Sequence, residues 1–229
     1  MSFWVPGRRP AEEILDGNLP APEAEASLSD IEWVHRNLGG RILLARRLLP
    51  LLSTLAGDDG SLSLLDLGCG SGHVGRDLIS AFAGRGGFLR AFGLDLKVTH
   101  ARLSPRGRAA AADALALPFA NQSVDVVFST LLLHHFSPSE IATLLVEAKR
   151  VARRAVVSFD LTRHRVALAL ISVVGPLAFR SRISTLDGQS SVRQAYTREE
   201  MARLAAPVLP GATLVAAGPF VWQLVWRRP

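Results

Sequence analysis

The stretch Leu64–Gly72, which reads LLDLGCGSG, decides how the rest of the chain is interpreted. An apolar run carries Asp66 near its end and is followed by three glycines, Gly68, Gly70 and Gly72. A short apolar run that ends in glycine is typical of a buried parallel strand, and small residues let the backbone approach a ligand closely. A helix that follows directly offers free N–H groups to a negative group. The stretch therefore predicts a strand, a ligand-binding loop and a helix.

Strand and helix signals alternate from this stretch to the end of the chain. Short apolar runs predict strands at 62–67, 88–94, 108–112, 124–129, 155–159, 212–216 and 220–226. Helical patterns cover 72–83, 138–151 and 197–204, and the last two begin with the Ser/Thr-x-x-Glu signature of a capping box. Alternating strands and helices imply a parallel sheet covered on both faces, so we expect a doubly wound α/β fold.

The segment before the sheet differs in composition. Residues 1–26 are rich in Pro, Ala and Glu and predict a loosely held arm. Two helices are expected next, one capped by Ser29-Asp30 and one over residues 41–55 with a kink at Pro50. We divide the chain into an arm and helical cap, residues 1–60, and an α/β domain, residues 61–229.

A dinucleotide-binding site is the first alternative for the glycine loop. The run Gly70–Gly75 fits the G-x-G-x-x-G fingerprint, and Asp95 follows 20 residues later. However, the glycines begin at Gly68, directly after the strand, so the fingerprint is displaced along the turn. The only tyrosine is Tyr196, and Glu200 stands where a short-chain dehydrogenase would need lysine. These observations argue against a nicotinamide cofactor.

The loop and four later segments together resemble a known family. DLGCGSG resembles motif I of the class I S-adenosylmethionine (SAM)-dependent methyltransferases. The other matching segments are 93–96 (GLDL), 113–119 (DALALPF), 123–128 (SVDVVF) and 133–136 (LHHF). They cover residues 62 to 160 in the family's order. The resemblance is to methyltransferase-11-like small-molecule enzymes, similar to those of ubiquinone and menaquinone biosynthesis. It implies a Rossmann-like sheet of seven strands in the order 3-2-1-4-5-7-6.

The resemblance also implies which residues hold the cofactor, S-adenosyl-L-methionine. Asp95 would bind the two ribose hydroxyls and Asp113 would face the adenine, while Asp66 organises the loop and Cys69 is a small filler. The implied cofactor-binding residues are Asp66, Gly68, Gly70, Gly72, Asp95, Leu96, Asp113, Ala114 and Leu131. The simpler alternatives are a tight turn without a ligand, a helix cap at Asp95 and a loop residue at Asp113.

Three further residues are candidates for catalysis. His134 and His135 follow the fourth strand, and Asp160 follows the fifth, so all three are expected at the ligand-binding edge of the sheet. A histidine there could remove a proton from the acceptor. Alternatively one ring packs and the other shapes the pocket, and Asp160 caps the next helix. We expect no metal site.

The apolar run Val166–Phe179 follows the fifth strand, where the family carries its acceptor lid. We predict an apolar helix inside a lid insertion at about 161–196, covering a hydrophobic pocket. The run is shorter than the roughly 20 apolar residues that cross a membrane. A core helix is one alternative. Arginines on both sides leave a second, a helix that lies on a membrane surface.

Composition narrows the partners. A net charge of +6 permits nucleic acid, anionic lipid or an anionic cofactor, but the arginines are scattered and no aromatic residues alternate with them. The single cysteine excludes an intramolecular disulfide, and the first residues lack a signal peptide. We therefore expect a cytoplasmic protein, monomeric or homodimeric, that touches membranes transiently at most.

The sequence thus predicts an enzyme that methylates O or C of a hydrophobic small molecule, such as a polyketide, phenol or quinone-like compound, in secondary metabolism. Two alternatives stay open. One is a nicotinamide-dependent oxidoreductase. The other is a methyltransferase-like domain that binds SAM but acts as a scaffold or catalyses a different reaction.

Overall fold

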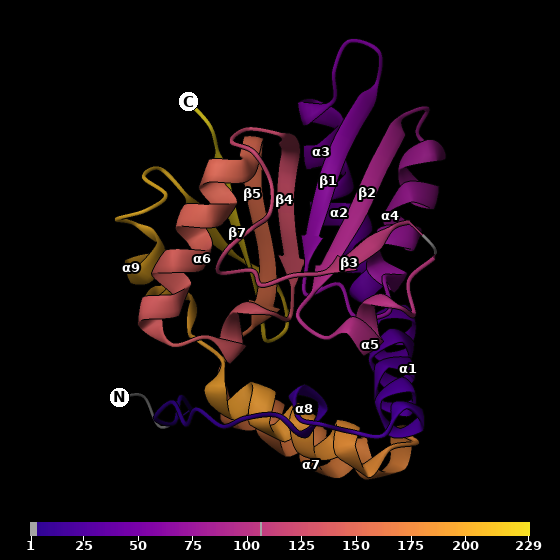
Figure 1. The fold of residues 1–229 in the computed structure, drawn as a ribbon. Helices are drawn as coiled ribbons and strands as arrows, with labels where there is room; N and C mark the ends of the chain where they lie inside the picture. The colour runs from indigo at the N-terminus through magenta and orange to yellow at the C-terminus, as the bar shows by residue number, and fades with distance from the viewer. Residues whose placement is uncertain (1–3, 106) are drawn as a thin grey trace.

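A computed structural model describes residues 4–105 and 107–229, which form one seven-stranded sheet with helices on both faces (Figure 1). The strands are β1 (Ser61–Leu67), β2 (Phe88–Asp95), β3 (Ala109–Ala111), β4 (Val124–Thr130), β5 (Ala152–Leu161), β6 (Thr213–Gly218) and β7 (Val221–Arg227). Their order is β3-β2-β1-β4-β5-β7-β6, with β7 antiparallel to both neighbours. The predicted fold class and strand order are confirmed.

The helices agree with the prediction over most of the chain. They are η1 (Ile14–Asp16), α1 (Ala21–Asn37), α2 (Gly40–Arg47), α3 (Leu49–Leu55), α4 (His73–Ala83), α5 (Val98–Ala101), η2 (Leu133–His135), α6 (Pro138–Val151), α7 (Arg165–Ala178), α8 (Arg182–Gln194) and α9 (Arg198–Ala205). Both predicted capping boxes form, before α6 and before α9. Pro50 stands in the first turn of α3, where proline is tolerated, so the predicted kink is a break between two helices.

Two apolar cores hold the sheet between its helices. On one face, Leu145 of α6 and Met201 of α9 are completely buried against strands that include β1 and β4. On the other face, Leu52 of α3 and Leu78 of α4 pack against side chains of the same strands. Because the central strands β1, β4 and β5 are covered on both faces, a ligand can reach them only at their ends.

The N-terminal part differs from the prediction. Helix α1 begins at Ala21, so Ser29 and Asp30 lie inside it and do not cap it. Asp30 is buried and accepts hydrogen bonds from the backbone N–H of Arg180 and Ser181, just before α8. The preceding arm is also not loose, because Arg8 donates to the carbonyl oxygens of His134, Phe136 and Gln194. Sequence periodicity carried no information about these long-range contacts.

The predicted lid is a pair of helices, and its second helix was not expected. Figure 1 shows α7 and α8 lying beyond the carboxyl ends of the strands, with the N-terminal arm running along them. Helix α7 packs on α8 closely, because Gly175 faces Thr185 and Gly188 faces Ile171. Helix α8 contacts η1, η2 and α1. The helix next to the sheet edge is therefore α8, not the apolar helix α7.

The apolar face of α7 is not a core face. Only Ala167 and Gly175 of this helix are buried, whereas Val173 is 67% and Leu177 86% exposed. The alternative of a core helix is therefore wrong. Within residues 4–105 and 107–229, no helix has the length and hydrophobicity needed to cross a membrane.

Candidate active site

The glycine loop joins β1 to α4 at the carboxyl edge of the sheet. Gly68, Gly70 and Gly72 have φ angles of +67°, +51° and +69°, which residues with a Cβ rarely adopt. A Cβ on Gly72 would lie 2.1 Å from Ser104 Oγ, and one on Gly68 would lie 2.7 Å from Leu132 Cδ1. The loop is therefore shaped by positions that only glycine fits, and α4 begins directly after it.

Asp95, at the end of β2, faces this loop. One carboxylate oxygen accepts the backbone N–H of Gly70 at 2.9 Å, and the other accepts that of Lys97 at 2.9 Å. His100 Nδ1 lies 3.3 Å from the second oxygen. Asp95 thus links the end of β2 to the glycine loop through Gly70. Its contact with Lys97 is the local, cap-like one that the simpler alternative expected.

The other predicted cofactor residues lie at the ends of neighbouring strands. Leu96 follows β2, Asp113 and Ala114 follow β3, and Leu131 follows β4. Leu96 is 68% and Leu131 41% exposed, although both are large apolar side chains. Leu131 also has a φ of +51°. Asp113 accepts the backbone N–H of Leu115 and is otherwise open to solvent.

Asp66 and Cys69 are buried beneath the loop. Burial, together with the nearby Asp95 carboxylate, raises the pKa of Asp66 to about 8. No backbone N–H within the described part of the chain donates to Asp66, so the expected role as a hydrogen-bonding organiser of the loop is wrong. Burial also raises the pKa of the Cys69 thiol, with Asp66 and Asp95 adding to the effect. A buried neutral thiol agrees with a small filler and not with a nucleophile.

The three candidate catalytic residues come together as predicted. His134 Nδ1 lies 2.6 Å from Asp160 Oδ1, and the other oxygen of Asp160 accepts the backbone N–H of His134 at 3.0 Å. Asp160 does not cap α7, because His164 does so through its Nδ1. The rings of His134 and His135 lie 4.3 Å apart between centroids. His134 and Asp160 are buried, whereas the side chain of His135 is 24% exposed.

Two carboxylates of the arm complete this cluster, and no sequence motif marks either of them. Glu13 Oε1 lies 3.5 Å from His134 Nε2, and Asp16 Oδ2 lies 2.8 Å from His135 Nδ1. Ser191 Oγ and Gln194 Nε2 of α8 donate to Glu13 Oε1, at 2.5 and 2.8 Å. Because they lie in a Pro- and Ala-rich segment without periodicity, only the folded chain shows that these acids reach the histidines.

Charge in the cluster shifts two pKa values. Burial by itself lowers the pKa of His134, but the Asp160 carboxylate and then Glu13 raise it to about 10. Burial acts to raise the pKa of Glu13, yet the two histidines bring it below its usual value. At 3.5 Å, Glu13 acts on His134 as a charge and not as a well-formed hydrogen-bond partner. A cation, whether a proton or another ion, is therefore favoured between these carboxylates.

Comparisons with known proteins agree with this geometry. Residues 64–155 match the family model described as a methyltransferase domain. These residues are therefore described as a methyltransferase domain. No curated protein sequence matches the chain.

The methyltransferase is also similar in fold to solved structures. One is a SAM-dependent methyltransferase from Aquifex aeolicus, at 15% identity and a TM-score of 0.58, with 87% of this chain and 97% of that chain covered. Another is the plantazolicin methyltransferase BpumL, in complex with a pentazolic desmethylPZN analog and SAH, at 13% identity, a TM-score of 0.61 and coverages of 90% and 94%. A third is the magnesium protoporphyrin IX methyltransferase from Synechocystis with bound SAH, at 16% identity and a TM-score of 0.51, with 93% of this chain and 90% of that chain covered.

The residues of this methyltransferase fit its cofactor. A carboxylate oxygen can accept about two hydrogen bonds, so Asp95 keeps acceptor capacity for two ribose hydroxyls after binding the N–H groups of Gly70 and Lys97. The exposed Leu96 and Leu131 offer apolar surface at the same rim, which a flat ring could cover. Gly68 is exposed at this rim, and the side chain of Leu132 occupies the space in front of its Cα.

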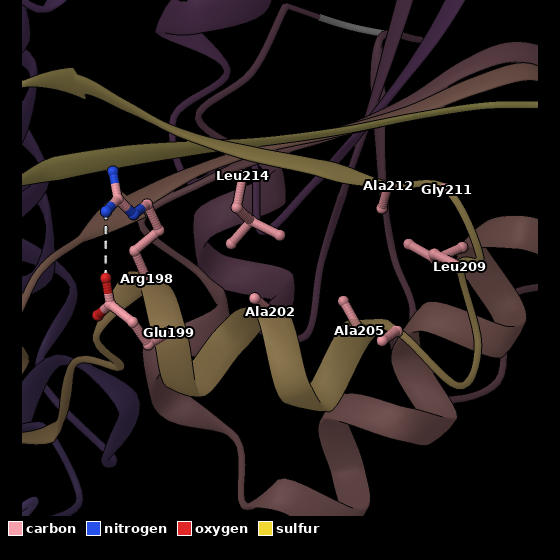
Figure 2. Close-up of a pocket in the computed structure, with 9 residues that line it drawn as sticks. Arg198, Glu199, Ala202, Ala205, Leu209, Gly211, Ala212 and Leu214 are labelled. Atoms are coloured by element: carbon pink, nitrogen blue, oxygen red, sulfur yellow. Dashed lines mark hydrogen bonds and ion pairs between the residues drawn. The ribbon is translucent and has the colours of Figure 1, made fainter.

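A pocket elsewhere in the methyltransferase does not belong to this site. Figure 2 shows it between α9, the turn after it and the edge strand β6. Its lining is mostly Ala and Leu, with an exposed Arg198–Glu199 ion pair at one end. It contains none of the residues at the carboxyl ends of β1 to β4, so we assign it no part in catalysis.

Proposed function

We propose that this methyltransferase transfers the methyl group of SAM to an oxygen or carbon of a hydrophobic small molecule, such as a polyketide, phenol or quinone-like compound of secondary metabolism. One observation carries the proposal: the glycine loop and the His134–His135–Asp160 cluster lie on the same rim. They are adjacent through Leu132, whose side chain covers Gly68 and whose carbonyl oxygen accepts the N–H of His135.

The cofactor, when bound, supplies an electrophilic methyl group on a positively charged sulfur. The tasks left to this chain are to hold the acceptor in line and to exclude water. Asp66, Gly68, Gly70 and Gly72 would surround the cofactor's amino acid part. Asp95 with Leu96 would hold the ribose, and Asp113 with Ala114 and Leu131 would surround the adenine.

The histidine cluster would activate the acceptor. His135 is the more exposed of the two rings, so its Nε2 is the atom that an acceptor could reach. His134 and Asp160 are buried behind it and act as positioning residues, because they fix the turn that carries His135. Replacing His135 by Ala should lower kcat at saturating SAM, and an unchanged kcat would exclude this role.

The N-terminal arm and α8 would close the acceptor side of the site. Glu13 is held by Ser191 and Gln194 of α8, so arm and helix move together or not at all. We propose a cap, residues 1–60, a methyltransferase domain, residues 61–229, and a lid at about 161–196, with these contacts joining the cap to the lid. The two relatives whose structures contain SAH methylate plantazolicin and a magnesium porphyrin, according to their names, which favours a small-molecule acceptor.

The exposed face of α7 supports a hydrophobic acceptor that is taken from a membrane. Val166, Leu170, Val173, Val174 and Leu177 are all exposed, and their spacing places them on one face of the helix. Arginines stand at both ends of this face, Arg165 at its start and Arg180 and Arg182 after its end. An apolar stripe flanked by cations is typical of a helix that lies in the interface of an anionic bilayer. We infer that a cytoplasmic enzyme binds there transiently.

Vesicle sedimentation tests the membrane contact. The enzyme should sediment with phosphatidylglycerol vesicles and less with phosphatidylcholine vesicles, and Leu177→Glu together with Val173→Glu should abolish this binding. Val146→Glu is the matched control, because Val146 is a similarly exposed apolar residue, 51% exposed, on α6. Equal vesicle binding by the α7 variant and the Val146→Glu control would show that the exposed face of α7 is not the membrane-binding surface.

Two measurements test the function itself. Calorimetry should detect binding of S-adenosylhomocysteine and none of NAD(P), and the reverse result would favour an oxidoreductase. Incubation with SAM labelled in its methyl group should then place label in organic-solvent extracts of a lysate. Tight cofactor binding without any labelled product would overturn the proposal in favour of a scaffold or a different reaction.

A further inference from the structure

Three side chains at the acceptor end of the site converge on one point. The Nε2 atoms of His134 and His135 lie 3.5 and 3.9 Å from the two oxygens of the Glu13 carboxylate. These ligand atoms all lie within 4.8 Å of one another. Two of the three residues are almost completely buried, and His135 faces the open side.

Each imidazole also contacts another carboxylate through its Nδ1 atom, and this contact fixes the orientation of the ring. His134 Nδ1 contacts Asp160 at 2.6 Å, and His135 Nδ1 contacts Asp16 at 2.8 Å. A carboxylate at this distance accepts the Nδ1 proton, so in the neutral imidazole the lone pair is on Nε2, where a metal ion would replace the second proton. Both lone pairs then point toward Glu13. A carboxylate behind each histidine is the usual arrangement around histidines that bind metal.

The contacts with Glu13 are too long to satisfy the atoms involved. His134 Nε2 is buried and has no hydrogen-bond partner among the described residues, although the side chain is only 3% exposed. Unpartnered buried polar atoms are rare in folded proteins. Ligands of a tetrahedral zinc ion stand about 3.3 Å apart when each bond is ~2.0 Å. Separations of 3.5 and 3.9 Å are therefore close to those of three ligands around one ion.

Charge leads to the same conclusion. The cluster contains three carboxylates, those of Glu13, Asp16 and Asp160, around two imidazoles. Arg8 lies nearby, but its guanidinium donates to backbone carbonyl oxygens and stacks over the Tyr196 ring. When both imidazoles are neutral, the negative charge of the buried Glu13 and Asp160 carboxylates therefore favours a cation inside the cluster.

We propose that Glu13, His134 and His135 bind one divalent transition-metal ion, with Asp160 and Asp16 as the residues that orient the two histidines. Nitrogen and carboxylate ligands of this kind suit zinc and its neighbours in the first transition row. The sequence predicted no metal site, because Glu13 lies 121 positions before His134 and inside a segment without any motif.

The position of the ion deepens the proposed function and rests on it. Three protein ligands leave at least one coordination position open, and His135 places that position on the exposed side of the cluster. A hydroxyl group of an acceptor could bind there, and a metal ion lowers the pKa of an oxygen that it binds. The cluster would then activate a phenol or enol through the ion.

Metal binding by itself tests the proposal without SAM or turnover. The untagged full chain is treated with a chelator, dialysed and titrated with Zn²⁺ in a calorimeter, and the Co²⁺ form is examined by absorption spectroscopy. We expect one ion per chain, a rise in Tm, and Co²⁺ bands typical of low coordination. Protection of residues 8–16 from hydrogen exchange should increase on addition of Zn²⁺, because the ion ties the arm to His134.

Variants separate this site from incidental binding. His135→Ala and Glu13→Gln should each abolish the equimolar binding, and Asp16→Asn should weaken it by about 10–100-fold, as for other residues behind a ligand. His164→Asn is the matched control, because it removes a histidine elsewhere while an amide can still cap α7. The melting temperatures of the metal-free variants show whether each chain is folded.

Two results would overturn the proposal. One is the absence of equimolar Zn²⁺ binding by the folded wild-type chain, and the other is binding that His135→Ala and Glu13→Gln do not change. Methyl transfer is measured separately, so the two proposals can fail independently. A protein that binds Zn²⁺ but transfers no methyl group would refute the proposed function alone, and one that transfers a methyl group but binds no Zn²⁺ would refute this inference alone.

Discussion

Asp95→Asn is the substitution that examines the cofactor site most directly. The carboxylate accepts the N–H groups of Gly70 and Lys97, at 2.9 Å each, and would accept two ribose hydroxyls as well. An amide of the same size keeps only one acceptor oxygen. At least one charge-assisted hydrogen bond to the ribose is then lost, and such a bond contributes about 1.5–3 kcal/mol. This corresponds to roughly a 10- to 150-fold increase in the Kd for S-adenosylhomocysteine.

The same variant also loses stability, so a control is needed. With one acceptor oxygen, either the N–H of Gly70 or that of Lys97 lacks a partner, at a cost of about 1–3 kcal/mol. Asp125→Asn is the matched control, because Asp125 lies at the opposite end of the sheet and likewise accepts a backbone N–H, that of Ser63 at 2.9 Å. Arg153 adds a charged contact at 2.8 Å.

Calorimetric titration with S-adenosylhomocysteine and urea unfolding together give the answer. Asp95→Asn should raise the Kd and lower the free energy of unfolding. Asp125→Asn should lower the free energy of unfolding but keep the Kd within about twofold, since it does not touch the cofactor rim. If Asp95→Asn has the wild-type Kd while both variants lose stability, Asp95 is a structural residue and the assignment of the ribose site is refuted.

Three further predictions concern local structure. Gly72→Ala should cost about 1–2 kcal/mol in urea unfolding and weaken S-adenosylhomocysteine binding, because its φ is +69° and its Cβ would meet a side chain; Gly84→Ala, at φ −62°, is the neutral control. Asp30→Ala should lower the free energy of unfolding by about 1–2 kcal/mol, because it removes the acceptor of two N–H groups before α8. Ser29→Ala, at an exposed position, should leave the free energy of unfolding unchanged, and equal losses in the two variants would contradict this role of Asp30. Cys69 should react with a thiol reagent only as fast as the protein opens, because burial raises its pKa, and fast labelling of the native chain would show the thiol to be exposed.

The sheet and its glycine loop could be predicted because their signals are local. The alternation of apolar residues with glycine and capping residues identified β1, α4, α6 and α9 to within a few residues, and motif spacing placed Asp95 and His134 on one edge. The central strands are covered on both faces, so each is a nearly continuous apolar run in the sequence and can be recognised without knowledge of distant contacts.

The parts that could not be predicted depend on contacts between distant segments. Glu13 and Asp16 acquire a role only when the arm docks on α8, and Asp30 accepts two N–H groups that precede α8, about 150 positions later. Helix α8 has few apolar residues to mark it, because all of its buried residues except Val192 are Ser, Thr, Asp or Gln. Helix α7 was predicted as a helix, but the side that faces solvent is set by Gly175 packing on Thr185, which no periodicity shows.

The docking of the arm has a consequence for biosynthesis. Arg8 and Glu13 bind partners that lie 126 and 181 positions later in the chain, so the arm leaves the ribosome long before those partners do. Arg8 and Glu13 therefore have no partners while the first strands of the sheet form. The prolines and charged residues of the arm disfavour its pairing with those strands during that time. The rim proposed to bind the cofactor is therefore synthesised before the segments proposed to receive the acceptor.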